Sequence, residues 1–105
     1  MRAEGKAALE AAQTADGKDN YDAAIAGYRN AHQLDPNIQV DALIQRVNDR
    51  KLAAGRKRCT DGLLDFSLGN NPVALPALQE AVRLLPQTDA CAVKARAALQ
   101  QLLGK

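Results

Sequence analysis

Apolar residues recur every three or four positions along most of this chain, which is the spacing of one face of an α-helix. Short segments rich in glycine, asparagine, aspartate and proline interrupt the pattern. Between these breaks the sequence is dominated by good helix formers, above all alanine and leucine. The pattern therefore predicts an all-α protein with five helices and no strand.

Glycine and proline set the boundaries of the predicted helices. Gly17 in the first turn tolerates positive φ, and Pro36 and Pro86 end the helices before them sharply. Thr88 is the expected cap of the last helix, and Pro76 is expected in the opening turn of the fourth. The expected helices cover residues 3–15, 21–34, 38–68, 73–85 and 89–103.

The third predicted helix is unusually long. Residues 38–68 contain no proline, and as one helix they would extend for about 45 Å at 1.5 Å per residue. Gly55 and Gly62 each cost about 1 kcal/mol relative to alanine inside a helix. The sequence leaves two alternatives open, one continuous helix or a bend or break near Gly55.

Composition indicates what kind of core these helices can form. Apolar residues make up 47% of the chain but aromatic residues only 3%, so the core must consist of alanine, leucine, valine and isoleucine. At 105 residues the chain is expected to form one domain over 1–105. Small apolar faces are expected on the first helix (Ala3, Ala7, Ala8, Ala11, Ala12) and an apolar stripe on the last (Ala92, Val93, Ala97, Leu99, Leu103).

Residues 19–36 and 69–86 form an internal repeat with an offset of 50 residues. In this alignment Ala24 matches Ala74, Tyr28 matches Leu78, Ala31 matches Ala81, Leu34 matches Leu84 and Pro36 matches Pro86. A small residue, a large one, a small one and a terminal proline at this spacing resemble the second helix of a tetratricopeptide repeat. Gly62 also matches the small residue in the middle of that family's first helix. The offset exceeds the family's usual repeat length by about 16 residues, which the long segment from Ile38 absorbs.

The resemblance implies helix hairpins stacked as a short right-handed superhelix, with one extended helix in the middle. It also implies a scaffold that binds a peptide or helix of another protein and has no catalytic activity. The expected groove-lining residues are Thr60, Leu63, Phe66, Ser67 and Lys94. The alternative function is self-association as a homodimer, through Leu43, Val47 and Ala54 of the long helix.

Positive charge gathers in the middle of the chain, although the net charge is only +2. The expected basic patch consists of Arg46, Arg50, Lys51, Arg56, Lys57 and Arg58. Arg46 and Arg50 lie one helical turn apart, where they would face an acidic segment, an anionic lipid surface or nucleic acid. The other interpretation is a solvated helix face, because Asp41 and Asp49 dilute the charge. A small surplus without interleaved aromatic residues argues against a nucleic-acid partner.

The sequence offers no pattern that is typical of catalysis or of a cofactor. His32 is the single histidine, and no cysteine, histidine or carboxylate cluster around it has metal-ligand spacing. No glycine-rich phosphate loop and no nucleophile–histidine pair is recognisable. His32 is therefore expected to be a surface residue, and no metal or cofactor is expected.

Cys59 and Cys91 are expected at the same end of two parallel helices, where a disulfide is geometrically plausible. A bridge would imply an oxidising compartment such as a bacterial periplasm. The alternative is two reduced, half-buried thiols in a cytoplasmic protein. No run of some 18 apolar residues is long enough to cross a bilayer, so direct insertion into a membrane is not expected.

Overall fold

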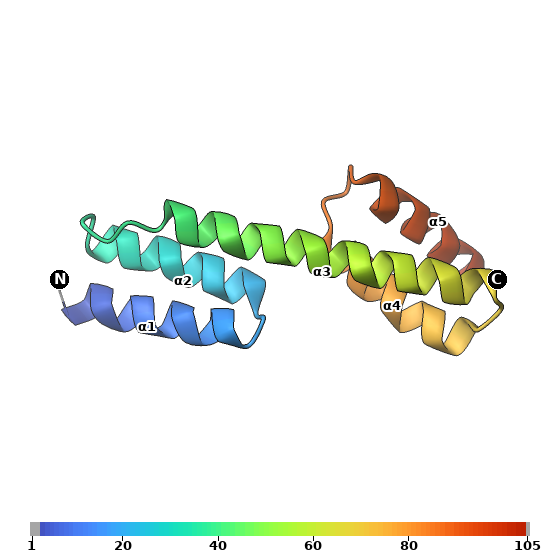
Figure 1. The fold of residues 1–105 in the computed structure, drawn as a ribbon, viewed down its shortest axis with the longest axis horizontal. Coiled ribbons are helices and arrows are strands. Elements are labelled where there is room, and N and C mark those ends of the chain that lie inside the picture. The colour runs from blue at the N-terminus through green and yellow to red at the C-terminus, as the bar shows by residue number, and fades with distance from the viewer. Residues whose placement is uncertain (1–2, 105) are drawn as a thin grey trace. The chain divides into compact units, whose positions relative to one another are not determined.

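The computed structural model describes residues 3–104, which form five helices and no strand (Figure 1). The helices are α1 (Ala3–Gly17), α2 (Tyr21–Leu34), α3 (Asp41–Ser67), α4 (Asn71–Leu84) and α5 (Ala90–Leu103). The predicted all-α class is confirmed. Stacking of the hairpins into a superhelix stays a prediction.

The chain folds into two compact units, unit 1 from Met1 to Arg50 and unit 2 from Lys51 to Lys105. The first part of α3 belongs to unit 1 and the rest to unit 2. Each unit has its own cluster of buried apolar side chains. The expectation that residues 1–105 form a single domain stays a prediction.

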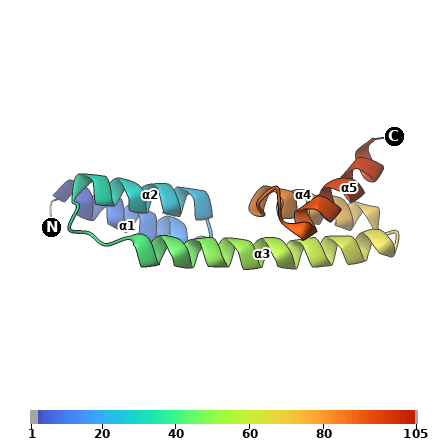
Figure 2. The same cartoon turned by 90° about the horizontal axis from the view of Figure 1, so that it is seen from above.

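In unit 1, α1 and α2 lie side by side and run antiparallel (Figure 2). Small residues bring the two backbones together, because a Cβ atom added at Gly27 would lie only 2.8 Å from the Cβ of Ala12. Close backbone approach lets a core of mostly small side chains reach the density of a protein interior. The expectation of a core without aromatic rings is wrong here, because the ring of Tyr28 is fully buried. The buried cluster consists of Ala12, Ala24, Ile25, Tyr28, Ala31, Ile38, Val40 and Val47.

Unit 2 is built in a similar way from the rest of α3, α4 and α5. Leu78 of α4 packs against Gly62 of α3, where an added Cβ would lie 2.9 Å from the leucine side chain. One large side chain therefore fills the space that a glycine leaves open. The buried cluster consists of Cys59, Ala74, Leu78, Ala81, Leu85, Ala92, Ala95 and Ala98.

The internal repeat is visible in the backbone as well as in the sequence. The turn from α1 to α2 is closed by a hydrogen bond from the Asn20 amide to the Ala15 carbonyl, at 2.9 Å. Its counterpart, 50 residues later, joins the Asn70 amide to the Asp65 carbonyl at 2.8 Å. The residue before each asparagine has positive φ, 57° at Asp19 and 78° at Gly69. Gly17 was expected to supply the positive φ of the first turn, and that expectation is wrong, because aspartate also tolerates this conformation.

Helix α3 is continuous through Gly55, so the alternative of a break there is ruled out. It begins at Asp41 rather than at Ile38, and Ile38 and Val40 are buried ahead of it. Gly55 is needed for packing, since an added Cβ would lie 2.7 Å from the side chain of Leu85. The glycine therefore permits close contact with α4 and does not interrupt the helix.

Two details of helix ends differ from the sequence-based expectations. The cap of α5 is Asp89, whose carboxylate accepts a hydrogen bond from the Cys91 amide at 2.9 Å, while the expected cap, Thr88, is exposed. Pro76 lies inside α4, beyond its first turn, because the helix already begins at Asn71. Its missing amide removes one bond of the helical ladder at an exposed position.

The predicted apolar faces of the first and last helices are wrong in part. Of the alanines expected to form the small face of α1, Ala12 is buried and Ala8 half-buried, but the other three are exposed. On α5 the residues buried are Ala92, Ala95 and Ala98. Val93, Ala97 and Leu103, which were expected in the stripe, are exposed. Both helices carry small apolar residues on several sides, so helical spacing does not single out one face.

Candidate functional site

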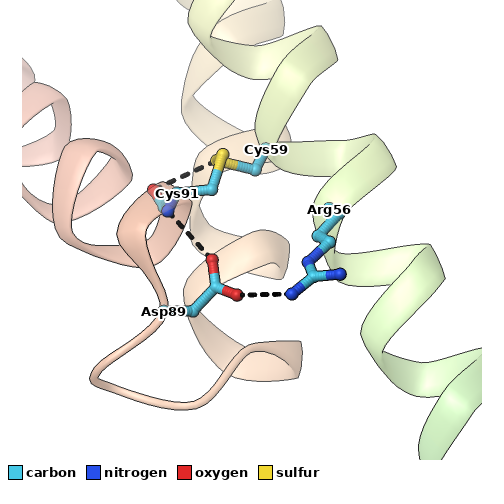
Figure 3. Close-up of a disulfide and its surroundings, with 4 residues drawn as sticks. All are labelled: Arg56, Cys59, Asp89 and Cys91. Carbon is cyan, nitrogen blue, oxygen red and sulfur yellow. Dashed lines mark hydrogen bonds and ion pairs between the residues drawn. A yellow bond between two sulfur atoms is a disulfide. The ribbon is translucent and has the colours of Figure 1, made fainter.

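A disulfide joins α3 to α5 in unit 2 (Figure 3). Cys59 and Cys91 have Cα atoms 6.2 Å apart, and the bond spans 32 residues of sequence. Cys59 is fully buried, and its Sγ also lies 3.1 Å from the carbonyl oxygen of Cys91. A disulfide sulfur has no proton to donate, so this is a close sulfur–oxygen contact. Of the two alternatives left open by the sequence, the structure has the bridge.

Polar contacts fix the start of α5 beside the disulfide. Arg56 of α3 donates to the second carboxylate oxygen of Asp89 at 3.3 Å, as Figure 3 shows. Partial burial raises the pKa of Asp89, but hydrogen bonds from the amides of Cys91 and Ala92 and the Arg56 contact outweigh it and leave the pKa lowered. Arg96 donates to the Gln87 carbonyl at 2.7 Å. The beginning of α5 is thus anchored by one covalent bond and several polar ones.

The predicted basic patch is largely engaged in interactions within each unit. Arg50 forms ion pairs with Asp16 and Asp19, donates to the Asp16 carbonyl at 2.9 Å and lies 5.7 Å above the ring of Tyr21. In unit 2, Arg56 pairs with Asp89, Lys57 pairs with Asp61 at 3.1 Å, and Lys51 is half-buried. Arg46 and Arg58 are exposed.

This arrangement corrects the expectation that Arg46 and Arg50 would together face an acidic partner. The acidic partner of Arg50 is the turn between α1 and α2 of the same unit. Arg50 therefore clamps that turn against α3, which is a structural role. Its side chain retains 41% exposure, so the clamp is partly solvated.

The clamp makes the stability of unit 1 sensitive to acid. Burial raises the pKa of Asp16, but hydrogen bonds from Arg50 and Tyr28 and the charges of Arg50 and Arg46 outweigh it and leave the pKa below its ordinary value. A lowered pKa stabilises the fold above the unfolded pKa of about 3.9, and this stabilisation is lost as pH falls through the folded pKa.

We therefore expect Asp16→Asn to lower the stability of unit 1 by about 1 kcal/mol at pH 7 and by less at pH 2, because protonation of the native carboxyl weakens its ion pair with Arg50 as the pH falls. Urea denaturation of both proteins at the two pH values measures the difference. Glu80 and Asp89 also have lowered pKa values, so acid destabilises the native protein and the variant alike through these two groups. Only the difference between the two proteins reports on Asp16. An equal gap at pH 7 and pH 2 would show that ionisation of Asp16 contributes nothing.

The five predicted groove residues do not form one exposed set. Leu63 and Phe66 are half-buried and pack against the cluster of unit 2. Thr60, Ser67 and Lys94 are exposed, and Ser67 uses its hydroxyl to donate to the Leu64 carbonyl at 2.8 Å. A binding role for these residues stays a prediction. Charged substitutions at Leu63 and Phe66 would disturb the core of unit 2, so a loss of binding would not distinguish a binding role from a folding role.

The sequence analysis did not predict which large apolar side chains are exposed. Leu64 is 58% exposed, Leu68 72%, Val73 50%, Val93 50% and Leu103 61%. All five belong to unit 2, and within residues 3–104 no large apolar side chain of unit 1 is comparably exposed. The offset of 50 residues would have revealed three of them, because Leu64, Leu68 and Val73 correspond to Thr14, Lys18 and Ala23.

The outer face of α5 carries an open hollow of about 630 Å³. Val93, Arg96, Ala97, Gln100 and Leu103 line it together with Leu99 and Gly104. It is mostly apolar, and the charged residues of α5 are Lys94 and Arg96, both cations. This α5 face is the candidate binding site of unit 2.

A second hollow, of about 480 Å³, lies in unit 1 between α2 and the start of α3. Arg29, His32 and Gln33 line it from α2, and Asp41, Ile44 and Gln45 from α3. His32 is exposed, and its Nδ1 lies 2.8 Å from the Ile38 carbonyl, so Nδ1 carries the proton and donates it. Within the described part of the chain, no group of three histidine, cysteine or carboxylate side chains is placed to hold a metal ion.

The residues expected to mediate self-association are used inside the fold. Val47 is fully buried in the cluster of unit 1, and Leu43 is half-buried against the same cluster. Ala54, in unit 2, is half-buried. This face of α3 covers the core and is not available to a second copy, which corrects the predicted surface.

No helix between residues 3 and 104 has the length and hydrophobicity that a membrane span requires. No family model matches the chain, and no curated protein or solved structure is significantly similar to it.

Proposed function

We propose that the chain is a tetratricopeptide-like interaction module that binds a helical or extended segment of another protein, and that unit 2 does the binding. The observation that supports the proposal is that, within residues 3–104, the five exposed large apolar side chains all lie in unit 2. Scattered exposed leucines are ordinary on protein surfaces, but a one-sided distribution between two related units needs an explanation.

Unit 1 serves as an internal control for the needs of the fold. It builds the same turn, with the same hydrogen bond across it, from Thr14 and Lys18 where unit 2 has Leu64 and Leu68. Polar residues therefore satisfy the fold at these positions. The leucines expose apolar surface without a structural requirement, and a protein partner that covers them would supply the reason.

The proposal includes no catalytic step, cofactor or nucleic-acid ligand. It does include a compartment, because a disulfide persists where the surroundings are oxidising. The Cys59–Cys91 bond supports a location such as the periplasm over the cytoplasm. Homodimerisation is the competing function, and the same experiment addresses it.

The test is affinity capture from the source cells with three versions of the oxidised protein. The first is the native chain, the second carries Leu64→Glu, Leu68→Glu and Val93→Glu, and the third carries Thr14→Glu and Lys18→Glu. All five positions are exposed, so each version should fold. We expect a partner with the native chain and the third version and loss of that partner with the second.

Equal capture by all three versions would contradict a binding role for unit 2. Recovery of copies of the chain alone, together with a dimer in light scattering, would favour self-association. Circular dichroism of each version provides the control for folding.

A further inference from the structure

Helix α5 has one face that builds the core and another that is left open. Ala92, Ala95 and Ala98 are buried to at least 96% against the rest of unit 2. On the opposite side, Val93 and Ala97 are exposed, and Leu103 is exposed at the C-terminal end of the helix. A surface helix of a globular protein usually has polar residues on that side.

The shape of this exposed face is suited to packing against a helix of a partner. Val93, Ala97 and Gln100 follow one another at i, i+4 and i+7, so they lie along one line of the helix. The side chains of Val93 and Gln100 stand on either side of the small Ala97, so the hollow of about 630 Å³ can receive a side chain from a partner. Small residues at such a point let two helix backbones come close.

The face is too small for a stable dimer of this chain. One stripe of this 14-residue helix exposes less than the roughly 800 Å² that each partner buries in a stable interface. One stripe of a short partner helix matches the face in size. The binding expected from such a contact is reversible.

The charge of α5 selects among partners. Lys94 and Arg96 are cations, and residues 90–103 contain no carboxylate. Lys94 is exposed, while Arg96 is half-buried in the hollow, where its bond to the Gln87 carbonyl holds the guanidinium in place. Two copies of α5 packed on each other would bring four cations together. A partner with aspartate or glutamate beside its apolar stripe would instead complement them.

We infer that the α5 face binds an acidic amphipathic helix of a partner protein, with the apolar stripe over Ala97 and carboxylates beside Lys94 and Arg96. The inference rests on the proposed function and names the chemistry of its partner. An anionic membrane would share part of this chemistry. Two cations are fewer than the clusters of four to eight that mark lipid-binding segments, so the protein partner is favoured.

The experiment uses two synthetic 18-residue peptides with the same leucine stripe at helical spacing, one with glutamate and one with lysine on the flanks. Fluorescence anisotropy measures their binding to the oxidised 105-residue chain at low salt. We expect the acidic peptide to bind roughly ten-fold more tightly than the basic one, from a few-fold gain for each complementary charge. In spectra of the labelled protein, the chemical-shift changes should fall on α5.

Three variants locate the site and separate this inference from the proposed function. Val93→Asp should abolish binding of the acidic peptide, and Lys94→Glu should weaken it roughly five-fold. Ala23→Asp is the matched control, because it places the same charge at an exposed apolar residue of unit 1, and it should leave binding unchanged. All three substitutions are at exposed positions, so the fold is expected to persist.

Equal affinity for both peptides would overturn the inference, and so would stronger binding to vesicles with 30% anionic lipid than to the acidic peptide. Loss of binding with a fourth variant, Leu64→Asp, but not with Val93→Asp would also overturn it. That last result would leave the proposed function intact, since a protein segment would still bind unit 2. Failure of the proposed function would appear differently, as equal partner capture by all versions of the chain.

Discussion

Loss of the Cys59–Cys91 disulfide should lower the free energy of unfolding of unit 2 by about 3–4 kcal/mol. The bond closes a loop between residues 32 positions apart, and its removal returns the corresponding loop-closure entropy to the unfolded chain. The fold has little to replace it, because the buried contacts of α5 come mainly from alanines. Alanine side chains bury little apolar surface.

Urea denaturation with and without a thiol reductant measures this loss. Hydrogen exchange should show the largest gain in exchange rate in α5, which the bond ties to α3. A Cys59→Ala, Cys91→Ala variant is the control, because it should match the reduced protein and should not respond to the reductant. Equal midpoints for oxidised and reduced native protein would contradict the prediction.

The helices that sequence predicts best are the two that repeat. In α2 and α4 most of the apolar residues recur on one side, and Pro36 and Pro86 follow the helix ends closely. Ala24 and Ala74 are fully buried, as the spacing indicated. One strong periodicity and one strong stop signal therefore sufficed to place these helices and their buried faces.

Helix α5 shows where the same reasoning fails. Its existence is predictable from helix propensity, but alanine, valine and leucine occur on nearly every side of it. Its orientation is decided by the disulfide and by the small alanine face that fits close to α4. Both are tertiary constraints. Val93, Ala97 and Leu103, which were expected in the buried stripe, are exposed and belong to the proposed binding site.

The prediction for the basic residues was wrong for a related reason. From the sequence, Arg50 was expected to face a partner together with Arg46, one helical turn earlier. Its ion-pair partner in the structure is Asp16, which lies 34 residues earlier in the chain. Spacing along the sequence predicts ion pairs within one helix, such as Lys57 with Asp61, but it contains no information about ion pairs between helices. Leu64 and Leu68 could have been found from sequence, because aligning the two copies shows leucine at these positions where unit 1 has Thr14 and Lys18.

The repeat also predicts how unit 1 should respond to substitution of Tyr28. This side chain is 1% exposed and occupies the position that Leu78 fills in unit 2. Tyr28→Ala should destabilise unit 1 by about 3–5 kcal/mol, the usual cost of removing a buried aromatic side chain. Urea denaturation gives the free energy, and hydrogen exchange in α1 and α2 locates the loss.

Two further variants separate the volume of Tyr28 from its hydroxyl group. The hydroxyl donates to Asp16 at 2.9 Å, so Tyr28→Phe should cost about 1 kcal/mol through that bond. Tyr28→Leu installs the residue of the other copy and should retain most of the packing, at a cost of about 2 kcal/mol. If Tyr28→Leu were as damaging as Tyr28→Ala, the two positions would not be equivalent in packing. If it is tolerated, the repeated position requires bulk, and the hydroxyl belongs to the Asp16–Arg50 clamp that unit 1 has in addition.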